Sequence, residues 1–361
     1  MQKTKNTTIY DIANRVKVSP STVSRVLTNA SHPVSSVVRE QILQAAKEMN
    51  YVPNAQARYL KTLNNPSIGV IIPSIDNPFY PSIVRGASDE ARERNYSIYL
   101  ANCDREYELT DRQIQSLLEL NVQGILSIYL DAITPSLKNF VQRGGRLVSL
   151  SSSTFYFEGA HNIQTNKIEE TRIAMRHLMD LGHRKIALLM NELNCQIRFD
   201  KVEGYKQSLK EAGIPFQKEY LYVYGKDCCS SGRLHGRLDA DEGNDFVEAL
   251  LERSPEVTAI LCMNDIMALG VCSALRDRHY DVPKDYSVMG YDDAFFSAFC
   301  NPTITTVALK KYEWGRSIMR YLIDMIDERN SQSTSFISEE RMLEPVHLIQ
   351  RESTGAPRTE E

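Results

Sequence analysis

Residues 8–27 read TIYDIANRVKVSPSTVSRVL, a stretch that predicts two short helices separated by a tight turn. Thr8, with Asp11 three residues later, is typical of a helix N-cap with an acidic first turn. Ser19-Pro20 then pairs a cap with a first-turn proline, which predicts the start of a second helix. The two predicted helices form one local unit at the start of the chain.

A third helix closes this predicted unit. It is expected to begin at a cap at Ser35 or Ser36, because the apolar residues that follow share one helical face: Val38, Ile42, Ala45, Ala46 and Met49. Two short helices joined by a tight turn and closed by a third indicate a helix-turn-helix. A plain three-helix bundle would show the same apolar spacing, so this pattern leaves both interpretations open.

The open side of the second helix carries the candidate DNA contacts. It is slim and polar, so it can enter the major groove, which is about 12 Å wide. Arg25 can fork onto a guanine, the strongest single base contact available on this helix. Ser19, Thr22 and Ser24 can make only short hydrogen bonds, which suit the phosphates that set register.

Charge is distributed unevenly along the chain, whose net charge is −4. Residues 1–61 hold nine Lys/Arg against three Asp/Glu, a net charge of +6, and the remainder holds 33 basic and 43 acidic residues, a net charge of −10. A basic head on an acidic body favours a head that meets a polyanion. A solvated basic face without a partner is the alternative.

Composition excludes several classes of protein. The chain has 361 residues, 42% of them hydrophobic and 24% charged, which indicates a globular protein of more than one domain rather than a disordered one. Its seven cysteines are too sparse, and odd in number, for a disulfide scaffold. No apolar run approaches the ~20 residues of a membrane span, and no signal peptide is evident. We therefore expect a cytoplasmic protein without membrane contact.

Residues 54–60, which read NAQARYL, predict a capped helix of under two turns. A helix this short is marginal in water unless it packs against something. Leu60, exposed among small and polar neighbours, could wedge between base steps from the minor groove. The alternative is that Leu60 packs on the next domain.

At this point the sequence resembles a known family. The stretches TIYDIANRVKVSPSTVSRVL, ASHPVS, REQI and NYVPNAQARYLK are similar to the head of the lac repressor family of bacterial transcription regulators. The resemblance implies that Arg25 reads the operator, that Pro20 and Ser21 help set its sequence, and that Ala57 and Leu60 enter the minor groove. The full set of DNA-binding candidates is Tyr10, Ser19, Pro20, Ser21, Thr22, Ser24, Arg25, His32, Asn54, Ala57 and Leu60.

From residue 65 the pattern changes to apolar β-rich runs that alternate with amphipathic helices. Eight strands are expected, at 68–72, 97–101, 124–128, 147–150, 185–190, 220–223, 259–262 and 287–290. Such alternation predicts parallel sheets covered by helices, and about four strands in each half suggest two similar lobes. Ligands bind in the crevice at the carboxyl ends of such strands.

Polar and aromatic residues follow several of these strands. Asn264 and Asp292 can exchange hydrogen bonds with vicinal hydroxyls, and Phe79 or Tyr80 can pack on a ring. We favour ligand contact for Asn264 and Asp292, although Asn264 could instead cap a helix. For Asp265 the helix-cap interpretation is preferred.

The resemblance extends through this body. IPSIDNPFYPSIVRGASDEA, NDIMALG, VPKDYSVMGYDD, NPTITTVA and RES are similar to the family's effector domain, which has a periplasmic-binding-protein-like fold. It implies that Phe79, Tyr80, Asn264 and Asp292 bind the effector, and that Arg198 contributes. The family arginine three residues before Gly204 is Lys201 here, and no aromatic residue lies between Tyr224 and Phe246, where one commonly stacks on the ligand.

No chemistry of an enzyme is evident. The pair Cys228-Cys229, with His235 and Asp239, is poorly spaced for zinc, and a redox role for it has no support. The nucleotide-binding, hydrolase and zinc-protease motifs are absent. We expect no metal, no cofactor and no catalytic residue.

Together these patterns predict an α/β protein with an all-α helix-turn-helix head and a two-lobed parallel α/β effector domain. The expected divisions are a head at 1–53, a hinge helix and linker at 54–64, an N lobe at about 65–160 plus 295–325, a C lobe at about 161–294 plus 326–350, and a tail at 351–361. The predicted function is a transcription regulator, a repressor controlled by a small metabolite such as a sugar or nucleoside. Its predicted partners are a pseudo-palindromic operator, the effector and a second copy. The alternative is a small-molecule-binding protein with a non-functional head.

Overall fold

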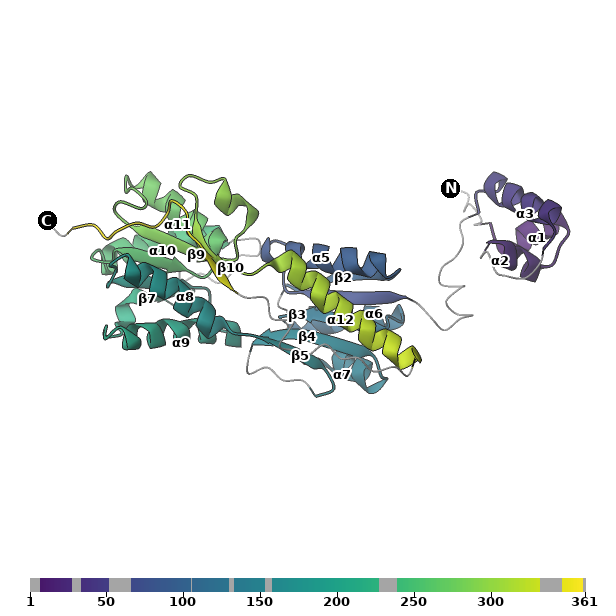
Figure 1. Cartoon of the computed structure of the whole chain (residues 1–361), viewed down its shortest axis with the longest axis horizontal. Coiled ribbons are helices and arrows are strands. Elements are labelled where there is room, and N and C mark those ends of the chain that lie inside the picture. The colour runs from purple at the N-terminus through teal and green to yellow at the C-terminus, as the bar shows by residue number, and fades with distance from the viewer. Residues whose placement is uncertain are drawn as a thin grey trace. The chain divides into compact units, whose positions relative to one another are not determined.

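The computed structural model describes residues 7–27, 34–51, 66–104, 106–129, 133–152, 158–226, 239–331 and 346–359. The chain divides into two compact units, residues 1–65 and residues 66–361. The first is a small helical head and the second is an α/β body (Figure 1).

The head packs three helices around a small apolar core: α1 (Ile9–Val16), α2 (Pro20–Leu27) and α3 (Ser36–Glu48). Thr8 and Asp11 cap α1 reciprocally, because the Thr8 amide donates to Asp11 Oδ2 over 2.8 Å and the Asp11 amide donates to Thr8 Oγ1 over 3.3 Å. Lys17, at φ 55°, ends α1 in the left-handed conformation. Each helix gives the core a fully buried residue: Ile12, Val23 and Ile42.

The N lobe of the body is a parallel five-stranded sheet in the order β2-β1-β3-β4-β5. Its strands are β1 (Ser67–Ile72), β2 (Ser97–Asn102), β3 (Gly124–Ile128), β4 (Arg146–Ser152) and β5 (His161–Thr165). Its helices are α5 (Phe79–Glu93), α6 (Tyr107–Glu119), α7 (Pro135–Gln142) and α12 (Lys311–Ser331). Helix α12 approaches α5 closely, since a Cβ on Gly315 would lie 2.1 Å from the Ile83 carbonyl oxygen.

The C lobe is a six-stranded sheet in the order β11-β10-β9-β8-β6-β7, with only β11 antiparallel to its neighbour. Its strands are β6 (Ile186–Met190), β7 (Leu221–Val223), β8 (Ala259–Cys262), β9 (Ser287–Tyr291), β10 (Thr305–Ala308) and β11 (His347–Ile349). Its helices are α8 (Lys167–Asp180), α9 (Gln196–Glu211), α10 (Asp239–Arg253) and α11 (Asp265–Asp277), with 3-10 turns η1 (Lys218–Tyr220) and η2 (Phe295–Ala298). The predicted helical head and two-lobed parallel body are confirmed.

The lobe boundaries differ from the predicted ones. Strand β5 pairs with β4 in the N lobe, so the C lobe does not begin at residue 161. Residues 295–308, expected in the N lobe, hold η2 and β10 of the C lobe, and α12 stays with the N lobe to Ser331 rather than ending it at 325. The three strands missed from the sequence, β5, β10 and β11, have only three to five residues.

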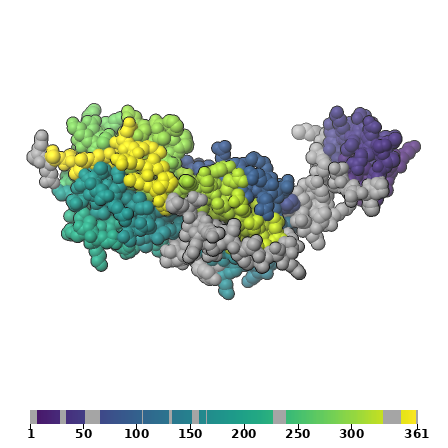
Figure 2. Space-filling model, in the orientation of Figure 1, coloured from purple at the N-terminus to yellow at the C-terminus, as the bar shows by residue number. Residues whose placement is uncertain are grey.

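The C-terminal stretch is part of the C lobe and not a separate tail as far as residue 359. Ser353 Oγ donates to the Val288 carbonyl over 2.6 Å, and His183 Nε2 lies 2.9 Å from the Gly355 carbonyl oxygen. Because a carbonyl oxygen can only accept, Nε2 carries the proton of this fully buried imidazole. Figure 2 shows the yellow C-terminal stretch lying on the surface of the C lobe. None of the described helices is both long and apolar enough to cross a membrane.

Candidate functional site

Most of the described DNA-contact candidates of the head lie on α2 and on the turn before it. Ser19, Ser21 and Arg25 are exposed, whereas Val23 and Val26 on the opposite side of α2 are buried. The other candidates on this surface are half-buried or, for Tyr10 on α1, exposed: Pro20, Thr22, Ser24 and Tyr10. The polar face of α2, which includes the Arg25 guanidinium, is therefore open to solvent.

Ser19 organises the start of α2. Its Oγ accepts a hydrogen bond from the Thr22 amide over 3.2 Å and so caps the helix. The same Oγ lies 2.7 Å from Ser21 Oγ and 2.8 Å from Thr22 Oγ1, so three hydroxyls form one cluster at the N-terminal end of α2. Such an end, with its orphan amides and positive dipole, favours an anionic group such as a phosphate.

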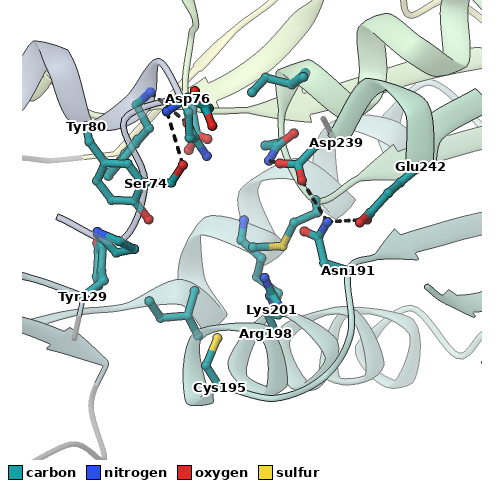
Figure 3. Close-up of a pocket in the computed structure, with 18 of the residues that line it drawn as sticks. Ser74, Asp76, Tyr80, Tyr129, Asn191, Cys195, Arg198, Lys201, Asp239 and Glu242 are labelled. Carbon is teal, nitrogen blue, oxygen red and sulfur yellow. Dashed lines mark hydrogen bonds between the residues drawn. The ribbon is translucent and has the colours of Figure 1, made fainter. Parts of the chain in front are cut away.

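A cleft of about 580 Å³ lies between the two lobes of the body, within the usual range for small-molecule sites. The five predicted effector residues all line it: Phe79, Tyr80, Arg198, Asn264 and Asp292. They come from four separate elements, and the close-up in Figure 3 shows the cleft with residues from both lobes around it.

The N-lobe wall of the cleft is aromatic. Phe79 and Tyr80 begin α5, and Tyr129 follows β3. The Phe79 ring centroid lies 5.3 Å from that of Tyr80 and 6.0 Å from that of Tyr129. Asn77 Oδ1 accepts from the Phe79 amide over 2.9 Å, which holds the start of α5 in place. This wall can pack on the apolar face of a ring.

The opposite wall, from the C lobe, is a network of amides and carboxylates. Asn191 Nδ2 donates to Asp239 Oδ1 over 3.1 Å and to Glu242 Oε2 over 2.5 Å (Figure 3). Asn264 Nδ2 donates to the second oxygen of Asp239. Two amides therefore orient one carboxylate toward the cleft, and a carboxylate accepts hydrogen bonds from ligand hydroxyls.

Asp292 lies where β9 ends, in a strained turn. Asp292 has φ 97° and Asp293 has φ 47°, a left-handed pair that costs about 1–3 kcal/mol per residue. Lys311 Nζ holds the turn by donating to both of their carbonyl oxygens, and Arg351 pairs with the Asp293 carboxylate over 2.5 Å. Burial raises the pKa of Asp292, against the opposing effect of Lys201 and other lysines.

A buried ion pair lies beside Asp292, and its lysine lines the cleft. Lys167 Nζ lies 2.6 Å from Glu170 Oε1, and both side chains are at least nine-tenths buried. Burial would lower the pKa of Lys167, but the Glu170 charge and Tyr129 raise it above its ordinary value. The ammonium also lies 5.5 Å from the Tyr129 ring centroid. Lys167 therefore stays charged, with Glu170 as its partner.

The head and the body each match a known family. Residues 8–54 match the bacterial regulatory proteins of the lacI family, and residues 175–354 match the periplasmic binding protein-like domain. The chain is 30% identical to the HTH-type transcriptional repressor PurR of Mannheimia succiniciproducens, over 90% of this chain and 93% of that protein. The chain belongs to the lacI family. It is therefore a DNA-binding transcription regulator.

Solved structures of lacI-family regulators share this architecture. The lac repressor dimer bound to operator and the anti-inducer ONPF has a TM-score of 0.77 at 26% identity, over 98% of this chain and all of that one. The complex of the transcriptional regulator CelR with cellobiose has a TM-score of 0.66 at 26% identity, over 96% of this chain and all of that one. The similarity thus extends over both units of this regulator.

One sequence interpretation in this lacI-family cleft is wrong. Asp265 was expected to cap α11, but Asn264 is the cap, since its Oδ1 accepts from the Met267 amide over 2.9 Å. Asp265 Oδ2 instead accepts from the Ala294 amide over 2.9 Å and from Ser297 Oγ over 2.7 Å, which holds the turn after β9. Burial raises the pKa of Asp265 to about 7, against the lowering effect of its bond to Ser297.

Sequence reasoning missed further cleft residues that follow strands. Tyr129 follows β3, Lys167 lies two residues after β5, Asn191 follows β6, and Tyr224 follows β7. Their position at the carboxyl ends of parallel strands is a signal that could have identified Tyr129, Asn191 and Tyr224, whose strands were predicted, but not Lys167, because β5 was not predicted. Glu242 lies within α10, away from any strand end, and no comparable signal marks it.

Several predicted features lie outside the described residues. They are His32, Asn54, Ala57 and Leu60 of the DNA-binding set, the helix predicted over 54–60, and Cys228, Cys229 and His235. Within the part of the chain that the structure describes, no group of three His, Cys, Asp or Glu side chains could hold a metal ion.

Proposed function

We propose that this regulator is a homodimeric repressor of a two-fold operator, acting in the cytoplasm and not as an enzyme, whose DNA affinity is set by a polyhydroxylated small molecule between its lobes. One observation carries the proposal. The cleft sets an aromatic wall opposite a carboxylate held by two amides, in a chain whose head exposes a polar helix. Cellobiose, bound in the CelR complex, is a ligand of this polyhydroxylated class.

In the head, Arg25 is the proposed base-reading residue, and the hydroxyl cluster on Ser19 is the proposed phosphate contact. Arg25 is exposed on α2, where a guanidinium can donate two hydrogen bonds to a guanine. Ser19, Ser21 and Thr22 share one end of the helix, which suits the phosphate backbone. The proposed DNA-binding surface also includes Tyr10, Pro20 and Ser24.

In the body, the proposed effector contacts are the aromatic wall and the polar groups facing it. Phe79 and Tyr80 would pack on the ligand ring, while Asn264 and Asp292 would bind hydroxyls and Arg198 would donate to an oxygen. Arg198 is 5% exposed, and its Nη1 donates to Asn194 Oδ1 over 2.7 Å, so its guanidinium is already oriented. Preorganised contacts of this kind reduce the entropy lost on binding.

The proposed dimer forms through the body. One head makes few base contacts, so a stable complex needs two heads on half-sites about one helical turn apart. Large apolar side chains are exposed on the body: Tyr99, Leu100, Tyr107, Phe295 and Phe299. Phe299 is 85% exposed and Phe295 is 77% exposed, which is typical of a surface that a partner covers.

Control by the effector is a population shift between lobe arrangements. A ligand that binds two arrangements unequally changes the fraction of dimers able to hold DNA, and one that binds both equally changes nothing. Asp292 lies at the junction between the lobes. Lys311 is the first residue of α12 in the N lobe, and its ammonium donates to the Asp292 carbonyl oxygen. A ligand at Asp292 therefore touches the connection between the lobes.

Operator selection from random duplexes, followed by titration with candidate effectors, tests the function. We expect one two-fold sequence to be enriched and its affinity to change when the cleft is filled. Deletion of residues 1–61 should abolish DNA binding and leave ligand binding unchanged. Ligand binding by a full chain that enriches no sequence would instead favour a small-molecule-binding protein with a non-functional head.

A further inference from the structure

Lys201 is a buried lysine in the wall of the cleft whose Nζ has no hydrogen-bond acceptor in the part of the chain that the structure describes. It lies on α9, lines the cleft and is 3% exposed. Its Nζ has no hydrogen-bond partner among the described residues, and it stands 3.0 Å from the Tyr291 ring centroid. A buried ammonium without an acceptor costs several kcal/mol of desolvation free energy, so a ligand that brings an acceptor stabilises the charged form of Lys201.

Most of the charges around Lys201 are already committed elsewhere. Glu170 and Lys167 face it from α8, and they pair with each other. Asp292 faces it from the turn after β9, and Asp265 faces it from α11, where it holds the turn at Ser297. Burial lowers the pKa of Lys201 to about 7, with Lys167 adding to the effect and the three carboxylates opposing it. Near neutral pH the ligand-free protein therefore holds Lys201 partly as the uncharged amine.

The start of α9 adds positive potential at the same place. Cys195 is the N-cap of this 16-residue helix, and its side chain makes no capping hydrogen bond. Cys195, Arg198 and Lys201 all line the cleft, and the spacing of three residues puts Arg198 and Lys201 on one helix face (Figure 3). An uncapped helix N-terminus next to a permanent guanidinium charge attracts an anion.

We propose that the effector is a sugar acid, a polyhydroxylated monocarboxylate whose carboxylate is bound by Lys201 and Arg198 at the N-terminus of α9. This inference rests on the proposed function, because it names the ligand class of the same cleft. Hydroxyls of such a ligand meet Asp292 and the carboxylate of Asp239, which two amides orient. A phosphate dianion is disfavoured, since Asp239, Glu242 and Asp292 line the same cleft and would repel its second charge.

Binding of a carboxylate has a second consequence, which a neutral sugar does not share. The carboxylate pairs with the ammonium form of Lys201, so binding above pH 7 takes up a proton from solvent. Affinity should then fall with rising pH, approaching tenfold per pH unit between pH 8 and pH 9. A neutral sugar can bind the uncharged amine and needs no proton.

Calorimetric titration of the full chain tests this with matched probes. They are D-glucuronate against D-glucose, D-galacturonate against D-galactose, and D-gluconate against D-glucitol, each at pH 8 in two buffers of different ionisation enthalpy. At least one acid should bind ten or more times tighter than its neutral partner, with uptake of close to one proton. Lys201→Met should remove both the preference and the proton uptake. Lys201→Arg should keep the preference and lose the proton uptake, because guanidinium does not titrate in this range.

Lys206→Met is the matched control, because Lys206 is exposed on the same helix with its Nζ 5.1 Å from the Phe216 ring centroid. It should leave both measurements unchanged. Binding of none of the acids, equal binding of acid and neutral sugar, or tighter binding of D-glucose 6-phosphate would each overturn the sugar-acid assignment. Operator binding of the same preparation separates the two failures. If a neutral sugar changes the affinity for the operator, the proposed function stands and only the sugar-acid assignment is wrong. If no operator sequence is enriched, the proposed function itself is wrong.

Discussion

Most of the candidate DNA surface of the head lies on one short helix and the turn before it, whereas the cleft of the body is assembled from residues more than 200 positions apart. Ser19 caps α2 and lies next to the exposed face of that helix, so contacts between residues close in sequence form the surface. In the cleft, Phe79 and Asp292 belong to different lobes, and only the packed sheets bring them to one cavity. A surface formed by neighbouring residues can be substituted without a loss of stability elsewhere. In a cavity formed by residues far apart in sequence, a substitution affects both ligand binding and the stability of the fold.

This difference separates the expected effects of substitutions. A variant on the open face of α2 should change DNA binding and leave the stability of the body unchanged, since the two units are compact by themselves. A variant in the cleft should change ligand binding and stability together, because its buried charges interact with one another. The predictions below test this separation.

Lys201→Met should stabilise the ligand-free protein by about 2–4 kcal/mol, because it removes a buried amine whose pKa is depressed from 10.5 to about 7. Between pH 7 and pH 10 the unfolded lysine binds more protons than the folded one, so the parent gains stability as pH rises. The advantage of the variant should therefore be largest at pH 7 and shrink toward pH 10. Chemical denaturation at several pH values measures this, and an advantage that does not vary with pH would contradict it.

Asp292→Asn should weaken effector binding by about 1.5–3 kcal/mol, since a charged acceptor for hydroxyls becomes a neutral amide. Asparagine tolerates the left-handed backbone at φ 97°, so the turn should survive. Calorimetry with the best ligand of the screen gives the loss. Asp277→Asn, on an exposed position of α11, is the control and should bind as the parent does.

Arg25→Ala should lower operator affinity by about 1–3 kcal/mol and leave nonspecific DNA binding nearly unchanged, because a guanine contact carries sequence information. Competition between operator and random duplex at fixed salt measures both quantities. Lys47→Ala removes one exposed charge from α3 and should leave the preference for operator intact. An equal loss on all DNA for Arg25→Ala would show that the guanidinium meets only phosphates.

Thr8→Ala should destabilise the head by about 1 kcal/mol, since it leaves the Asp11 amide without its capping oxygen. Hydrogen exchange of α1 amides should become faster, while the amides of the body sheets keep their rates. Thr8→Ser, which retains the hydroxyl, should behave as the parent does. Faster exchange in the body would contradict the independence of the two units.

The head was predictable from sequence to within one or two residues because its helix ends are local. Thr8 and Ser35 cap their helices through hydrogen bonds to residues three positions ahead, so the pattern is contained in a short stretch. Eight strands of the body were also predicted close to their observed bounds, since buried parallel strands form continuous apolar runs. Strand β5 reads HNIQT, and its pairing with β4, not its composition, makes it a strand.

The cleft was predictable only in part. All five expected effector residues line it, since each was placed from a strand end or from the family resemblance. The cap expected at Asp265 is wrong, because two adjacent polar residues at a helix start give the same pattern whichever one caps it; Asn264 caps α11 and also lines the cleft. The lack of a hydrogen-bond acceptor for Lys201 among the described residues could not be foreseen, since it depends on the pairing of Lys167 with Glu170 on another helix.

The path of the chain through the lobes has a consequence for synthesis on the ribosome. The N-lobe core includes Trp314, Ile318 and Leu322 of α12, and the C-lobe sheet ends with β11, at 347–349. Neither lobe can therefore complete its core until nearly the whole chain has been translated, whereas the head has all its helices after about fifty residues. A nascent or prematurely terminated chain would carry a finished head on an unfinished sensor.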